Sequence, residues 1–167
     1  MRREILIAIP VLGLAAILQL AIISRMALLS GCADLILIIL AAWALQERVR
    51  SAWIWGVAGG LLVGFVSGVP IYIYLLGYLV VIGVARLLTR RIWQAPLLAM
   101  FAVTIIGTLV LLLVTFAYRS LVEVPLAFND VLVQIILPST LLNLLWAIPI
   151  HALIRDLAER LYPLEAE

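Results

Sequence analysis

The sequence predicts an all-α integral membrane protein with six transmembrane helices in a single domain over residues 1–167. Apolar residues make up 67% of the chain and charged residues 12%, whereas charged residues are about a quarter of a typical soluble protein. Mean hydropathy is +1.29. Six apolar segments and an uneven distribution of the arginines also indicate a membrane protein. The chain therefore has room for one helical bundle and for no appended soluble domain.

The six segments follow from the rule that about twenty mainly apolar residues cross the hydrocarbon core of a bilayer. Their approximate bounds are 5–24, 28–45, 52–66, 71–88, 94–118 and 131–154.

The arginines predict how the bundle is oriented, because cytoplasmic loops carry an excess of positive charge. All eleven cationic side chains are arginines, and with six crossings and a cytoplasmic N-terminus nine of the eleven are cytoplasmic. Only Arg25 and Arg119 then face outward. Removing one crossing would put the clusters near Arg48 and Arg90 on opposite sides. Both termini are therefore expected in the cytoplasm.

The first two segments differ at their starts. Arg2 and Arg3 precede a long apolar run, which favours a signal-anchor helix over a cleaved signal peptide. Gly31, Cys32 and Asp34 interrupt the second segment, so its first turns are expected to be a loop or partial helix on the outer side. Asp34 suits a helix start, where an acid meets the helix dipole favourably. The single cysteine, Cys32, is interpreted as a small apolar filler near the outer surface, with a free reactive thiol as the alternative.

The third segment carries glycines at four-residue spacing: Gly56, Gly60, Gly64 and Gly68. This pattern exposes backbone on one helix face and allows another helix to approach closely in lipid. The neighbour is either another helix of the same chain or a partner subunit. Our mechanistic hypothesis is that this face and the fourth segment, joined by the tight turn 68–70, shape a groove for a partner's single helix.

Aromatic and basic residues mark the expected boundaries of the segments. Tryptophans and tyrosines favour membrane interfaces. The inner boundary carries Trp43, Trp53, Trp55 and Trp93, and the outer boundary carries Tyr72, Tyr74 and Tyr118. The basic turn 86–91 joins the fourth and fifth segments. It is interpreted as a solvated cytoplasmic loop, with anionic lipid or cytoskeletal filaments as alternative contacts.

The sixth segment holds most of the polar residues expected at membrane depth. They are Gln134, Ser139, Thr140 and Asn143, with Gln19 as their counterpart in the first segment. One interpretation is hydrogen bonding between helices, worth about 0.6 kcal/mol on average in membranes. The other is a small-molecule pocket. Pro138 and Pro149 are expected to bend this helix and to free backbone carbonyls for neighbouring donors.

No familiar motif of catalysis is found in the sequence. It has no phosphate-binding GxxxxGK loop, no HExxH metal motif and no GxSxG nucleophile elbow. The lone His151 has no second histidine with which to share a metal. We expect no catalytic residues, metal or cofactor, and no nucleic-acid binding, because no basic face with interleaved aromatics exists outside the apolar segments.

Three segments together are similar to a known family. The second opens Ala33-Asp34-Leu35-Ile36-Leu37 and continues to Trp43, and the third reads GVAGGLLVGFVSG from 56 to 68. The sixth carries three residues in the order seen near the family's C-terminus: Asn143, Pro149 and Arg155. In this arrangement the chain resembles the MreD family of bacterial rod-shape-determining proteins, six-span components of the cell-elongation machinery.

The resemblance implies a non-catalytic scaffold in the bacterial inner membrane that binds the transmembrane helix of the single-span protein MreC. Such a scaffold supports rod shape and lateral peptidoglycan synthesis, beside RodA, a class B penicillin-binding protein and MreB. Two positions depart from the family pattern. Many members have an acid where Gly64 stands and a proline where Ala33 stands. Any contact that the acid makes in the family must be made differently here or not at all.

The main alternative follows from the resemblance of this family's fold to the substrate-binding subunits of energy-coupling-factor vitamin transporters. Such a subunit binds a small vitamin between its outer loops and later helices. It docks on its coupling subunit through alanines spaced AxxxA in its first span. The first segment here has no alanine pair four residues apart, its alanines being Ala8, Ala15, Ala16 and Ala21.

Overall fold

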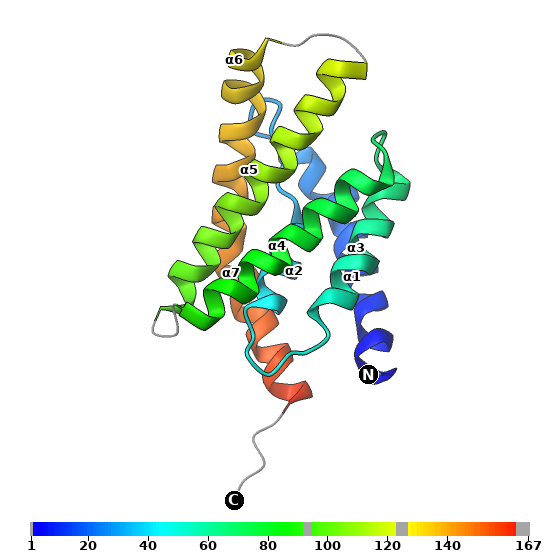
Figure 1. The fold of residues 1–167 in the computed structure, drawn as a ribbon, viewed down its shortest axis with the longest axis vertical. Coiled ribbons are helices and arrows are strands. Elements are labelled where there is room, and N and C mark those ends of the chain that lie inside the picture. The colour runs from blue at the N-terminus through cyan, green and yellow to red at the C-terminus, as the bar shows by residue number, and fades with distance from the viewer. Residues whose placement is uncertain (1, 92–94, 123–126, 163–167) are drawn as a thin grey trace, which may run out of the picture.

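The computed structural model describes residues 2–91, 95–122 and 127–162, which form six helical rods (Figure 1). The first five are α1 (Arg2–Ala21), α2 (Leu35–Ala44), α3 (Ala52–Val66), α4 (Ile71–Arg91) and α5 (Pro96–Val122). The last combines α6 (Phe128–Val131), the π-helical turn η2 (Leu132–Ile136) and α7 (Leu137–Leu161). A short 3₁₀ turn, η1 (Ile23–Arg25), follows α1.

Four of the rods are long and apolar enough to cross a membrane. They are the α1 rod, α4, α5 and the rod from Phe128 to Leu161. The chain is therefore an all-α protein of membrane character, as the sequence predicts. All six expected segments are helical, but α2 has 10 residues and α3 has 15, so spanning length is reached by only four rods in the described part of the chain.

Helix α2 lies at the centre of the bundle. It contacts α1, α3, α4, α5 and α7, and each of its ten residues is at most 6% exposed. Its residues are apolar on every face, which is compatible with this fully enclosed position. The expected second segment began near residue 28, whereas the helix begins at Leu35 and residues 26–34 form a connection. The interruption predicted at Gly31, Cys32 and Asp34 is therefore confirmed.

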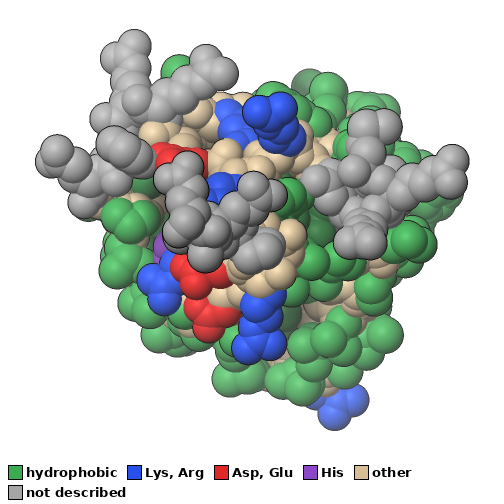
Figure 2. Space-filling view, turned by 90° about the horizontal axis from the view of Figure 1, so that it is seen from below, with side chains coloured by type: hydrophobic (Ala, Val, Ile, Leu, Met, Phe, Trp, Pro, Cys, Tyr) green, Lys and Arg blue, Asp and Glu red, His purple; other side chains and the backbone are tan. Residues whose placement is uncertain are grey.

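Several helix ends lie together at one end of the bundle. Helix α1 begins and α7 ends at the lower end of the bundle in Figure 1, where the connection between α2 and α3 also lies. The view from below shows arginine and acidic side chains gathered at this end, within a surface that is otherwise largely hydrophobic (Figure 2). This end is the one that the arginine pattern predicts to be cytoplasmic.

Close helix packing depends on glycine at several crossings. A Cβ on Gly60 would lie 2.7 Å from the Cα of Leu75, and one on Gly64 would lie 2.9 Å from the Cα of Ile71. Both neighbours belong to α4, whose backbone therefore approaches α3 directly. Between α4 and α5 the glycine instead makes room for a side chain, because a Cβ on Gly107 would lie 2.6 Å from Val81 Cγ2.

Two tryptophans depart from the expected interfacial position. Trp43 and Trp55 are both fully buried, and their rings stack on each other with centroids 4.3 Å apart. The interpretation of these two residues as interfacial anchors is wrong, because α2 is enclosed and α3 turns Trp55 toward it. Trp53 is exposed, as an anchor would be. Trp93 lies outside the described residues.

Candidate functional site

A polar network inside the described bundle starts from Asp34, at the N-terminus of α2. Its Oδ1 accepts a hydrogen bond from the backbone N–H of Leu37 at 3.0 Å, which makes it the N-cap of the helix. Its Oδ2 accepts a hydrogen bond from the hydroxyl of Tyr78 on α4 at 2.8 Å. One carboxylate thus satisfies an otherwise unpaired amide of the first turn and joins α2 to α4.

Neighbouring helices supply acceptors for the backbone that leads into α2. The N–H of Asp34 donates to Oδ1 of Asn143 at 2.7 Å, and the N–H of Leu35 donates to Oε1 of Gln19 at 3.0 Å. The N–H of Cys32 donates to Oγ of Ser139 at 3.1 Å. Backbone amides buried without partners would destabilise this non-helical segment, so these three side chains are what permit it to enter the bundle.

Asn143 extends the hydrogen bonding to a fifth helix, α5. Its Nδ2 donates to Oγ1 of Thr108 on α5 at 2.8 Å, and both residues are buried. The side-chain amide of Asn143 therefore accepts a hydrogen bond at the start of α2 with its oxygen and donates one to α5 with its nitrogen. These two partners fix the orientation of the amide. Residues from α1, α4, α5 and α7 meet the N-cap of α2 in this network. We call it the Asp34 network, and its members are Gln19, Asp34, Tyr78, Thr108, Ser139 and Asn143.

A proline in the last rod frees a backbone acceptor for the same connection. Pro138 has no N–H to offer the carbonyl of Gln134 four residues earlier. That carbonyl, within the π-helical turn η2, accepts the N–H of Ser30 at 3.1 Å. A Cβ on Gly31 would lie 2.7 Å from the backbone nitrogen of Ser139, so the connection also needs glycine here. The expected release of a carbonyl by Pro138 is confirmed.

A cavity of about 230 Å³ adjoins the Asp34 network. Both polar and apolar side chains line it, and the ones that matter for its chemistry are Gln19, Asp34, Tyr74, Thr108, Ser139 and Asn143. Cys32 also lines it and is exposed. A second hollow of about 200 Å³ shares Gln19, Val63 and Tyr74 with the first, and its remaining lining is mostly apolar.

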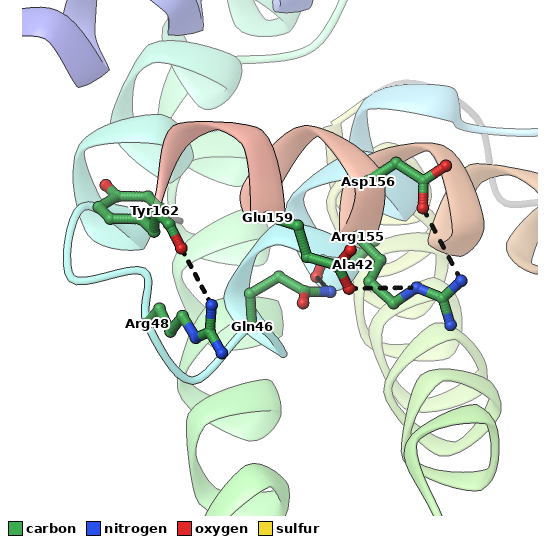
Figure 3. Close-up of polar contacts among 7 residues, drawn as sticks. All are labelled: Ala42, Gln46, Arg48, Arg155, Asp156, Glu159 and Tyr162. Carbon is green, nitrogen blue, oxygen red and sulfur yellow. Dashed lines mark hydrogen bonds and ion pairs between the residues drawn. The ribbon is translucent and has the colours of Figure 1, made fainter. Parts of the chain in front are cut away.

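A separate set of polar contacts lies at the lower end of the bundle (Figure 3), and one of them joins distant parts of the chain. Arg48 donates from Nη1 to the carbonyl of Tyr162 at 3.0 Å, and Gln46 donates to the carbonyl of Ala42 at 3.2 Å. Arg155 lies 3.8 Å from carboxylate oxygens of both Asp156 and Glu159. These ion pairs are solvent-exposed, so they contribute little to stability.

Arg86 on α4 also acts at the lower end. Its guanidinium donates to the carbonyl of Gln46 at 3.3 Å and to the carbonyl of Val49. Both carbonyls belong to the connection between α2 and α3. A fixed planar guanidinium can serve two acceptors at once, so one side chain holds this connection against α4.

The structure places the polar residues that the sequence predicts at membrane depth in different environments. Gln19, Ser139 and Asn143 come together in the Asp34 network. The side chain of Gln134 is exposed, and only its backbone carbonyl contributes. Thr140 donates to the carbonyl of Ile136 within its own rod. Sequence reasoning missed Tyr78 and Thr108 as partners, because a single tyrosine or threonine in an apolar helix carries no sign of its neighbour.

The predicted glycine face lies apart from this network. Gly56, Gly60 and Gly64 face Ile82, Leu75 and Ile71 of α4, which belong to the same chain. Gly68 has open space where a side chain would stand. The face between α3 and α4 is thus filled by the chain itself, and the groove hypothesized for a partner helix at Gly60 and Gly64 is not open.

The described residues contain no group of three or more His, Cys, Asp or Glu side chains that could hold a metal ion. Buried His151 has no hydrogen-bond partner for Nδ1 within the same ranges. The fold and site define an all-α membrane protein with a polar network enclosed in an apolar bundle. Comparisons with protein-family models, with curated proteins and with solved structures gave no match.

Proposed function

We propose that this protein is a non-catalytic scaffold of the bacterial cell-elongation machinery, in the inner membrane, binding the transmembrane helix of MreC. The observation that carries the proposal is the hydrogen bond between Asp34 and Asn143. These residues belong to two of the three segments that resemble the MreD family, and they are distant in sequence. Their contact gives the resemblance a physical reason, since both residues serve one network.

The use of the polar groups favours a scaffold over an enzyme. Both carboxylate oxygens of Asp34 accept hydrogen bonds from the chain, and the amide of Asn143 is bound at its oxygen and its nitrogen. Groups held in this way position helices relative to one another. A catalytic group instead needs a reacting partner within hydrogen-bond reach.

The partner helix would dock on α1. Of the four long rods, α1 has the smallest buried share in its most apolar window, 22% against 33–39% for the others. Gly13 on this helix has no atom within 4 Å of an added Cβ, and Ile9 and Ile17, one turn before and after it, are exposed. Bare backbone flanked by large apolar side chains allows close helix approach in lipid.

The test is gentle-detergent purification of the tagged protein from its native membrane, with mass spectrometry of co-purifying proteins and small molecules. We expect a single-span periplasmic protein together with RodA, a class B penicillin-binding protein or MreB. Gly13→Leu should reduce recovery of the single-span protein, whereas Gly68→Leu, at another open glycine, should not. Recovery of ATPase and coupling subunits with a bound vitamin would overturn the scaffold and establish the transporter alternative.

A further inference from the structure

The cavity beside the Asp34 network has a composition that a purely structural network does not require. Its wall carries one carboxylate, Asp34, which forms no ion pair with any described residue. Each carboxylate oxygen can accept more than one hydrogen bond, so the two bonds from Leu37 and Tyr78 leave acceptor capacity. The other polar side chains on the wall are amides and hydroxyls, beside the thiol of Cys32. Asp34 is half-buried, and a carboxylate partly removed from water without an ion pair is costly unless something offsets its charge.

The helix dipole offsets this charge only in part. The N-terminus of α2 carries the equivalent of roughly half a positive charge, while an ionised carboxylate carries a full negative one. The cavity next to Asp34 therefore favours a cation. Tyr74 adds to this preference because its aromatic ring also lines the cavity, and aromatic faces attract ammonium groups.

The second hollow determines what else a ligand would carry. It shares Gln19, Val63 and Tyr74 with the first, so the two spaces adjoin across these side chains. The rest of its wall is mainly aliphatic, including Leu20, Ile36 and Leu62. A molecule with a cationic head against Asp34 would place a short apolar group here, where burial is favourable.

We propose that these adjoining spaces form a binding site for a small organic cation with an apolar substituent, with Asp34 as its counter-charge. The site goes beyond the scaffold function and does not depend on it. Occupancy joins the connection 26–34 and helices α1, α4, α5 and α7 through one ligand.

The chain provides its own reporter for this site. Cys32 is the only cysteine, it is exposed, and it lines the cavity. The experiment compares the rates at which a cationic and an anionic methanethiosulfonate reagent modify Cys32 in the full chain in nanodiscs. We expect the cationic reagent to react about tenfold faster, which a partly screened charge at short range would produce. Asp34→Asn should remove most of this preference. Asp130→Asn, the same charge change on exposed α6, should leave it intact.

Ligand protection completes the test. Benzyltrimethylammonium should slow the modification of Cys32 by a small neutral methanethiosulfonate, and benzenesulfonate of similar size and opposite charge should not. Thr115→Leu fills the cavity wall without touching any hydrogen bond of Asp34, and it should abolish the protection in a protein that remains monodisperse. Equal rates for both charged reagents, or protection unaffected by Thr115→Leu, would overturn the proposal. Neither result bears on whether MreC co-purifies.

Discussion

The backbone N–H of Asp34 donates to Oδ1 of Asn143 at 2.7 Å, across 109 positions of sequence. Asn143 in turn donates to Thr108, so one amide joins the start of the central helix to both α5 and α7. Buried networks of this kind are sensitive to the loss of one member, because the remaining partners stay buried without a bond.

Replacing Asn143 by alanine should therefore destabilise the bundle markedly. The substitution leaves the N–H of Asp34 without its acceptor and Oγ1 of Thr108 without its donor. We expect a loss of about 2–4 kcal/mol, on the basis of about 1–3 kcal/mol for each unsatisfied buried group with partial relaxation. Denaturant unfolding in mixed micelles measures it. Asn129→Ala on exposed α6 is the control and should change stability by less than about 0.5 kcal/mol.

Glycine at position 60 should be required for the fold in the absence of any partner. A methyl group there would lie 2.7 Å from the Cα of Leu75, so Gly60→Ala must force α3 and α4 apart. Overpacking of this kind costs about 1–3 kcal/mol. Gly68→Ala meets no atom within 4 Å and should be neutral. Unfolding of the isolated protein distinguishes them, and equal stability of the two variants would contradict direct packing of α3 on α4.

Pro138→Ala should loosen the connection before α2. Alanine restores an N–H that competes with Ser30 for the carbonyl of Gln134. We expect faster hydrogen–deuterium exchange in a peptide covering residues 26–34, with little change in α5. Pro149→Ala, in the same rod but away from this contact, is the matched variant. The contact between Ser30 and Gln134 is unimportant if both variants exchange at the rate of the unmodified chain.

Arg86→Gln should destabilise the lower end far more than Arg155→Gln. Arg86 binds two backbone carbonyls of the connection between α2 and α3, whereas both ion pairs of Arg155 are solvent-exposed. Charged hydrogen bonds to otherwise unpaired groups contribute about 1.5–3 kcal/mol, and exposed ion pairs about 0–1 kcal/mol. Limited proteolysis of the 45–51 connection would detect the difference. Similar cleavage of both variants would show that Arg86 is dispensable there.

Local signals in the sequence predicted much of this architecture. The apolar segments are helices, Asp34 begins α2, and Pro138 leaves a carbonyl for a donor outside its own rod. The length of α2 and the stacking of Trp43 on Trp55 were not predictable in this way. A buried apolar helix and a lipid-facing one have the same composition, so periodicity cannot separate them.

Only part of the site could be predicted from the sequence, for a related reason. Gln19, Ser139 and Asn143 are conspicuous because polar side chains are costly in an apolar helix. Which backbone they serve depends on how the connection 26–34 folds back into the bundle, and that path is set by contacts distant in sequence. Tyr78 is an example. Its ring is buried like that of any core aromatic residue, but its hydroxyl donates a hydrogen bond to Asp34.

The short central helix has a geometric consequence for the whole bundle. Ten residues rise only about 15 Å, while the hydrocarbon layer that the long rods can cross is about 30 Å thick. Along the bundle axis, about half of the core must be supplied by something other than a central helix. At one end this space is closed by chain held to Arg86, and at the other it is left partly empty above Asp34. Lengthening α2 by one turn toward its N-terminus would therefore fill the cavity beside Asp34. It would also break the hydrogen bonds that Asp34 makes.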